Sequence, residues 1–283
     1  MFGPAIAALA ALSILLVGPA RATPFFFSTG DTDGRIATAS RPDSPGKFEI
    51  EAADDFVLTG TTRITSATFT GLVPDNASVT QVVIEIYRVF PSDSDVGRTS
   101  GSPTFSTPNV PTRVNSPSDV ALDARDSAVA GELAFTTTTL SSFTAPFSVR
   151  PGGIHQGTGG TGEVIGNEVE FGVTFVMPLD LPADHYFFVP QVQLDSGDFL
   201  WLSAPKPIVS SGTPFAPDLQ SWTRDASLDP DWLRVGTDIV GGTTFNAVFS
   251  LSGETTSVPE PTTLALLGVA LAGLGFSRRR KLH

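Results

Sequence analysis

The chain of 283 residues contains no cysteine, and this absence excludes several kinds of chemistry at once. A disulfide framework, a thiol nucleophile and a thiolate metal site all require cysteine. Stability must therefore come from a conventional hydrophobic core. Oxidising surroundings outside the cytoplasm would leave such a chain unharmed.

The sequence also lacks the short motifs of common hydrolases and metal enzymes. It has no G-x-S-x-G and no H-E-x-x-H, and its three histidines, at positions 155, 185 and 283, are far apart. Carboxylates are abundant, so a glycosidase-type pair stays open, although no particular pair stands out. We therefore expect a protein that is not an enzyme. The alternative is a secreted polysaccharide-active enzyme that uses a carboxylate pair.

Basic residues are few, and several of them lie at the ends of the chain. The whole sequence has 17 Lys and Arg against 29 Asp and Glu. Without Arg21, the basic run 278–281 and Glu260, the remaining body has 12 basic and 28 acidic residues, a net charge near −16. Such a surface repels nucleic acid and anionic membrane. Cationic partners, divalent ions and neutral sugars remain as candidate ligands.

No long amphipathic helical pattern occurs in the body, where a turn or two around residues 119–130 is the best helical candidate. Alternation of period two dominates instead: Val169, Phe171, Val173 and Phe175 are separated by Glu, Gly and Thr. The expected strands lie at residues 48–51, 56–58, 63–70, 81–90, 132–136, 169–175, 186–194, 199–203, 233–240 and 245–251.

Segments rich in Gly, Pro, Ser, Asp and Thr separate these strands, and residues 93–120 and 151–166 are the longest of them. Many short strands with turn-rich connections are typical of an all-β protein. We therefore predict one antiparallel β-sandwich domain over residues 23–252, of jelly-roll type, between a helix at each end of the chain.

The amino-terminal end has the pattern of a secretory signal peptide. An apolar run at residues 5–17 is followed by a Gly-Pro break and by Ala20-Arg21-Ala22, which matches an A-x-A cleavage site. No Lys or Arg precedes the apolar run, which departs from the usual pattern. The sequence predicts a signal peptide at residues 1–22, with cleavage leaving Thr23 as the new amino terminus.

The carboxyl-terminal end has three parts, which follow a predicted linker at residues 253–258. Val258-Pro259-Glu260-Pro261 is stiff because each proline fixes φ and removes an N–H donor. The apolar run at 262–276 has about 15 residues, fewer than the roughly 20 that span a membrane as a helix. Arg278, Arg279, Arg280 and Lys281 then supply a basic stop that favours the cytoplasmic side. We expect residues 259–283 to be a tail with one hydrophobic helix that anchors the chain temporarily.

This tail resembles the PEP-CTERM sorting signal of exosortase substrates, on the Val258–Pro261 motif, the short Leu/Ala/Gly run and the Arg-rich end. The resemblance implies processing by an exosortase, a membrane-embedded cysteine transpeptidase. It also implies export across the inner membrane to the cell surface or extracellular matrix, with an association with exopolysaccharide or biofilm. It covers about 25 of the 283 residues and carries no activity for the body.

The body itself is similar to uncharacterised β-sandwich proteins that bear this tail. Residues 53–58, Ala-Asp-Asp-Phe-Val-Leu, resemble the opening of such proteins, and residues 181–190 resemble a late strand entry of jelly-roll modules. Both are packing signatures. They support the fold only. The role expected of the body is binding or structural.

Two groups of aspartates are candidate calcium ligands, although no cofactor is otherwise expected. Asp31 and Asp33 precede a turn glycine, and Asp225, Asp229 and Asp231 form a second group. Neither has the full spacing of an EF-hand loop. Two interpretations stay open, because Asp side chains also stabilise turns by accepting bonds from nearby backbone N–H groups.

Tryptophan is confined to the last third of the body. Trp222 and Trp232 border polar segments and are candidates for stacking on a sugar ring, whereas Trp201 lies in an apolar run typical of core. Burial is the competing interpretation for all three.

Overall fold

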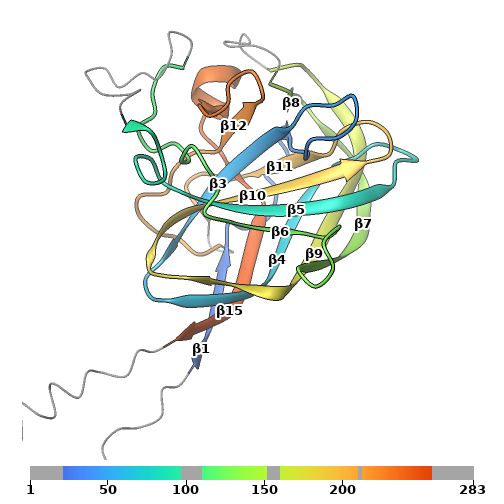
Figure 1. Cartoon of the computed structure of the whole chain (residues 1–283). Helices are drawn as coiled ribbons and strands as arrows, with labels where there is room; N and C mark the ends of the chain where they lie inside the picture. Colours follow the sequence, from blue (N-terminus) through green and yellow to red (C-terminus); the bar gives the residue numbers. More distant parts are fainter. Residues whose placement is uncertain (1–21, 97–109, 152–159, 210–211, 257–283) are drawn as a thin grey trace, which may run out of the picture. The chain divides into compact units, whose positions relative to one another are not determined.

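The protein is described by a computed structural model over residues 22–96, 110–151, 160–209 and 212–256 (Figure 1). Along these residues the chain forms strands and one π-helical turn. The elements are β1 (Ala22–Ser28), β2 (Ile36–Ala39), β3 (Ile50–Leu58), β4 (Thr62–Val73), β5 (Val79–Arg88), β6 (Asp123–Asp126), β7 (Leu133–Ala145), β8 (Phe147–Val149), β9 (Val164–Leu181), β10 (Asp184–Leu194), β11 (Leu200–Ala204), β12 (Trp222–Asp225), β13 (Leu233–Arg234), η3 (Val235–Val240), β14 (Asn246–Ala247) and β15 (Phe249–Thr256).

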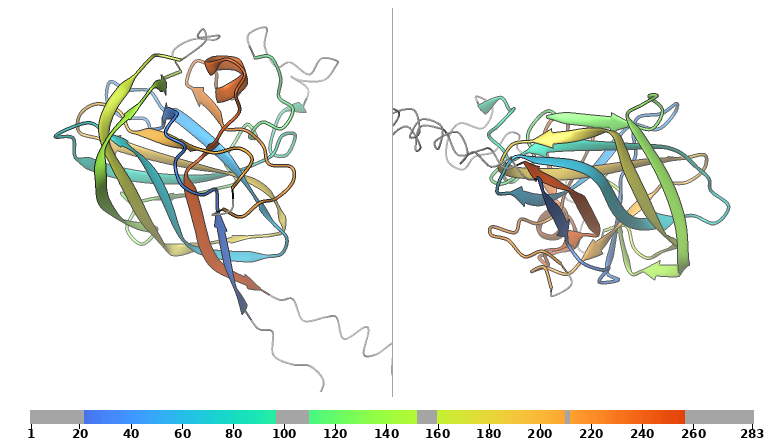
Figure 2. Two further views of the ribbon diagram at one scale, coloured as in Figure 1. Left: turned by 180° about the vertical axis from the view of Figure 1, so that it is seen from behind. Right: turned by 90° about the horizontal axis from the view of Figure 1, so that it is seen from below.

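Within the described residues the strands form two sheets (Figure 2). Six strands of the nine-stranded sheet follow the order β1-β15-β4-β11-β2-β8. In addition, β9 pairs with β4, β7 pairs with β9, and β14 pairs with β11. The six-stranded sheet runs β13-β12-β3-β10-β5-β6. The prediction of a mostly β protein is therefore confirmed.

One strand pair departs from the predicted antiparallel arrangement. Residues Ile36–Thr38 of β2 pair in parallel with Phe147–Val149 of β8, so the nine-stranded sheet is mixed, whereas the pairs of the six-stranded sheet are antiparallel. More than a hundred residues separate β2 from β8, and a connection of that length can enter a sheet in either direction. The jelly-roll topology stays a prediction.

The core is formed by aromatic side chains from both sheets. Phe69 and Phe171, from β4 and β9, stack with ring centroids 4.7 Å apart. Phe249 of β15 stacks on Phe188 of the other sheet, with centroids 5.0 Å apart. All four are buried, and they belong to the same cluster of core side chains. The period-two alternation of the sequence therefore identified the correct inward faces at Phe171 and Phe249.

Two segments differ from the sequence-based expectation. Residues 233–240 were expected as a strand, but only Leu233 and Arg234 pair, and η3 follows. Asp238 accepts the Arg234 backbone N–H at 2.9 Å, and Gly241 ends the turn with φ 110°, which glycine adopts readily. A turn or two around residues 119–130 was the best helical candidate, but Asp123–Asp126 form β6, which pairs with the edge of β5.

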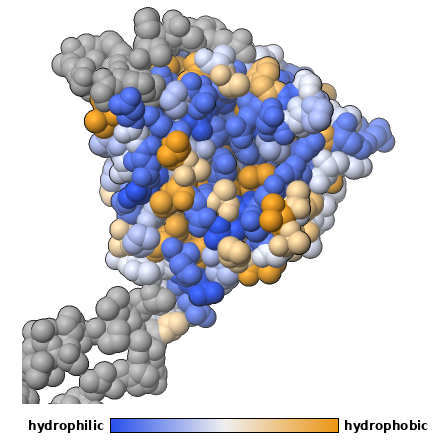
Figure 3. Space-filling view, in the orientation of Figure 1, coloured by the Kyte–Doolittle hydropathy of each residue, from blue (hydrophilic) through white to orange (hydrophobic). Residues whose placement is uncertain are grey.

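A second, smaller core covers the outer face of the six-stranded sheet. The loops that precede β6 and flank β12 lie across this face and bury seven side chains: Ala53, Tyr87, Phe187, Val189, Leu219, Trp222 and Trp232. Figure 3 shows that polar and apolar residues alternate over the surface seen there, without one continuous apolar patch. The side chains of interest below lie in or beside this second core.

The two ends of the compact unit Pro24–Thr255 lie on neighbouring strands, because β1 and β15 are adjacent in the nine-stranded sheet. β15 runs to Thr256 and so includes four residues of the predicted linker. The predicted signal peptide up to Arg21 and the predicted tail 259–283 lie outside the described residues. Among the described residues, no helix is long and apolar enough to cross a membrane.

Candidate functional site

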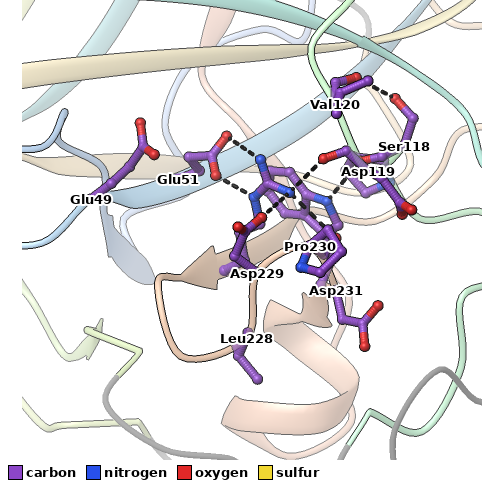
Figure 4. Close-up of polar contacts among 12 residues, drawn as sticks. Glu49, Glu51, Ser118, Asp119, Val120, Leu228, Asp229, Pro230 and Asp231 are labelled. Carbon is purple, nitrogen blue, oxygen red and sulfur yellow. Dashed lines mark hydrogen bonds and ion pairs between the residues drawn. The ribbon is translucent and has the colours of Figure 1, made fainter. Parts of the chain in front are cut away.

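An arginine and a glutamate form an ion pair on the outer face of the six-stranded sheet (Figure 4). Arg224 of β12 and Glu51 of β3 are brought together by the antiparallel register, in which they are direct partners. The Arg224 Nε and Nη2 atoms donate to the two Glu51 carboxylate oxygens. Both side chains are almost completely buried, at 5% and 3% exposure.

Tyr87 connects this ion pair to a second carboxylate. Its hydroxyl oxygen lies 2.6 Å from Glu51 Oε1 and 3.2 Å from Glu85 Oε2, and it accepts a bond from Arg224 Nη2. One phenolic proton cannot serve two carboxylates. Burial, followed by the negative charges of Glu51 and Glu49, raises the pKa of Glu85 to about 8. The raised pKa favours the protonated form of Glu85, which supplies the second proton of this network.

The remaining donors of Arg224 bind two loops. Nη1 donates to the carbonyl oxygens of Asp119 and Pro230 and lies 3.2 Å from Asp229 Oδ1. The guanidinium carbon lies 4.4 Å from the centre of the Trp232 ring, a cation–π distance. Arg224 thereby holds both loops against the sheet.

Glu49 completes the acidic group beside this ion pair. It lies at the entrance to β3, half-buried, and accepts a bond from Gln191 of β10 at 2.8 Å. Burial, with the charge of Glu51, raises the pKa of Glu49 above its ordinary value. The cluster Glu49, Glu51, Glu85, Tyr87 and Arg224 is called the Arg224 cluster below. Its half-buried carboxyls, Glu49 and Glu85, are the groups able to exchange protons with solvent.

Two adjacent aspartates of β3 are buried on opposite faces of that strand. Asp54 accepts bonds from Ser221 Oγ and the Ala247 backbone N–H, at 3.0 and 2.8 Å. Asp55 accepts the Leu219 backbone N–H and lies 2.5 Å from His185 Nε2. Burial raises the pKa of each carboxyl. They fasten the segments around β12 and β14 to the central strand β3.

The aspartates predicted as calcium ligands have other partners. Asp33 accepts bonds from the Arg35 backbone N–H and from Ser203 Oγ, whereas Asp31 is exposed. Asp225 accepts bonds from the Ser227 hydroxyl and from the backbone N–H groups of residues 227 and 228, which is turn chemistry.

The other two aspartates of that group pair with arginines. Asp229 approaches Arg224, and Asp231 accepts a bond of 2.7 Å from the fully buried Arg113. Each of these two carboxylates therefore lies beside a guanidinium. In the described part of the chain, no group of three or more His, Asp or Glu side chains is arranged to hold a metal ion.

The two tryptophans predicted to stack on sugar are inside the protein. Trp222 is 1% exposed and Trp232 is 0% exposed. The Trp232 indole N–H donates to the Ser118 carbonyl, and its ring packs edge-on against Tyr87. The loops over the six-stranded sheet cover both rings, so neither presents a face to a glycan.

Replacing Glu85 by glutamine is expected to change how stability depends on pH. A carboxyl whose pKa is raised on folding stabilises the folded state fully below its unfolded pKa, near 4.5, and this contribution is lost as pH rises through about 8. Each pKa unit corresponds to about 1.4 kcal/mol, so the full effect is a few kcal/mol. The native protein should melt at a lower temperature at pH 9 than at pH 6, and E85Q should lose most of this difference.

Glu170→Gln is the matched control, because Glu170 is an exposed carboxylate of β9. Thermal melting followed by circular dichroism at several pH values measures the effect. An E85Q protein whose melting temperature falls between pH 6 and 9 as steeply as that of the native protein would contradict a proton on Glu85.

Comparison with known proteins bears on the tail. The family model of the PEP-CTERM protein-sorting motif matches residues 257–281. No curated protein and no solved structure matches the chain significantly. The match covers the predicted motif Val258–Pro261 and the basic stop Arg278–Lys281. Both lie outside the described residues. The predicted signal-peptide cleavage site at Ala20–Thr23 is not tested by this match. The chain thus carries a carboxyl-terminal PEP-CTERM protein-sorting motif, which indicates an exported protein that is an exosortase substrate sorted to the cell surface.

Proposed function

We propose that this protein is a surface or extracellular-matrix component whose β domain binds a partner or builds structure rather than catalysing a reaction. The observation that carries this proposal is the sorting motif at residues 257–281. The Arg224 cluster supports it, since the Arg224–Glu51 pair is buried and its donors and acceptors are used in holding loops. Membrane attachment through the tail is temporary in this proposal.

We propose a neutral glycan, such as an exopolysaccharide of a biofilm, as the class of ligand. A groove of about 260 Å³ lies on the nine-stranded sheet, and six of its lining residues carry hydroxyl groups: Ser66, Thr68, Thr136, Thr174, Ser250 and Ser252. Hydroxyl groups donate and accept hydrogen bonds, as sugar hydroxyls do. A neutral ligand also avoids the repulsion that a net charge of −12 exerts on anions.

The competing function, a polysaccharide-active enzyme, is favoured by one observation. Burial raises the pKa of Glu85 to about 8, and Glu85 shares the Tyr87 hydroxyl with Glu51. Glycosidases use one carboxylic acid together with one carboxylate. Calcium binding is a further proposal that only a titration with the metal would support.

A glycan array and an assay for reducing-end release on the exported protein separate these functions. We expect binding without release of reducing ends. Thr68→Lys should abolish binding because it places a long charged side chain in the hydroxyl-lined groove, whereas Thr80→Lys, at an exposed position of β5, should not. Release of reducing ends that Glu85→Gln eliminates would favour the enzyme instead.

A further inference from the structure

Strand β7 lies at an edge of the nine-stranded sheet and has one described neighbour. It has 13 residues and pairs with β9 alone among the described strands (Figure 1). Among the described residues, no backbone hydrogen bond joins its other side to a residue outside β9. A strand in this position presents a row of N–H and C=O groups that can pair with another strand.

Protein sheets usually protect such an edge with charges or proline. Residues 133–145 contain neither, in a chain with a net charge of −12. Two other edge strands differ: β6 carries Asp123, Arg125 and Asp126, and β1 contains Pro24. β7 is therefore an edge without charge or proline on an acidic protein, and its pairing with β9 has one irregularity, between Thr139 and Ser141.

Both faces of β7 are uncovered over its central part. Every residue from Thr136 to Ser142 is exposed, although alternate residues of an edge strand normally face the core. Beneath the strand, Thr137 and Thr139 line a groove of about 280 Å³ together with Val79 of β5. The sandwich is thus open along this edge.

We propose that β7 pairs with β7 of a second copy of this chain. Elsewhere two copies repel each other through their net negative charge, but across this edge they bring two uncharged strands together. A two-fold axis normal to the sheet makes the pairing antiparallel and continues the nine-stranded sheet from one copy into the other. The same patch serves both partners, so the assembly closes as a dimer. This pairing goes beyond the proposed function and does not depend on tail processing.

The absence of cysteine makes the pairing directly measurable. Cysteine is introduced at one position at a time, from 137 to 141. In an antiparallel pair of identical strands, a residue lies opposite the same residue of the other copy only near the two-fold axis, so the introduced cysteines approach each other only there. A disulfide requires Cα atoms within about 7 Å, so mild oxidation should link two copies at one or two consecutive positions. Thr65→Cys, an exposed position on β4, is the control.

Charge gives the second test. Thr138→Lys places two lysines across the proposed axis region and should convert the dimer into a monomer in light scattering after size-exclusion chromatography. Thr65→Lys adds the same charge away from the edge and should leave the dimer intact. Because residue 138 is exposed, the substitution leaves the core unchanged.

Both measurements use the exported protein isolated from the cell surface, with its tail state determined by mass. A monomer at all accessible concentrations, a dimer that persists in Thr138→Lys, or disulfide formation no faster at residues 137–141 than at 65 would each overturn the proposal. A disulfide from these positions to a different protein would overturn it too, because the occupant of the edge would then be a foreign strand.

Discussion

Replacing Pro259, Glu260 and Pro261 by alanine should abolish carboxyl-terminal processing. The unprocessed chain should then stay attached to the membrane by its tail. The three residues lie within the matched sorting motif at 257–281. Alanine removes both fixed φ angles and the one carboxylate, so the segment loses its stiff extended form and its charge. The apolar run at 262–276 then stays attached and keeps its basic stop on the cytoplasmic side.

Mass spectrometry of the protein from the cell surface and from membranes checks this result. Glu254→Ala is the matched control, since it removes an exposed carboxylate six residues before Glu260 and outside the matched segment. It should be processed like the native chain. A native surface protein that still ends in Lys281-Leu282-His283 would show that no processing occurs.

Arg224→Met is expected to destabilise the folded protein by about 3–5 kcal/mol, because it leaves the Glu51 carboxylate buried without its partner. Methionine has a similar length, so the loss reflects charge and hydrogen bonds more than packing. The carbonyl oxygens of Asp119 and Pro230 lose their donor as well. Denaturant unfolding followed by tryptophan fluorescence measures the change.

Two further variants separate the ion pair from its surroundings. Arg63→Met removes a pair with Asp180 that is largely exposed and should cost under about 1 kcal/mol. Arg224→Met combined with Glu51→Leu should recover part of the loss, because the double variant leaves no uncompensated charge. An Arg224→Met protein as stable as the native one would mean that the pair contributes nothing to the fold.

The strands with strong alternation were predictable from the sequence because each has one buried face. Phe171 and Phe249 lie in the core as predicted, since a one-residue shift would move every aromatic of the strand to the surface. The strand expected at 233–240 was wrong beyond Arg234, because an apolar run broken by Gly236 and bounded by Gly241 also fits a helical turn.

The Arg224 cluster could not be predicted from the sequence in the same way. Glu51, Glu85 and Arg224 are far apart in the chain, and only the register of β3 with β12 and the position of β5 bring them together. The available signal was Glu85, which lies within the largely apolar run 82–87 of β5. The burial of Trp222 and Trp232, one of the two interpretations left open, could not be decided from the sequence because both residues border polar segments.

The position of β15 affects when the protein is able to fold during its export. β15 lies between β1 and β4, and its residue Phe249 bonds to Thr29, 220 residues earlier. Contacts between such distant segments form slowly, and here they also wait for the final strand. Because β15 ends at Thr256 and the matched sorting motif begins at residue 257, the strand that completes the nine-stranded sheet is the last part of the domain before that motif. The sheet cannot close between β1 and β4 before this last strand of the domain has been synthesised.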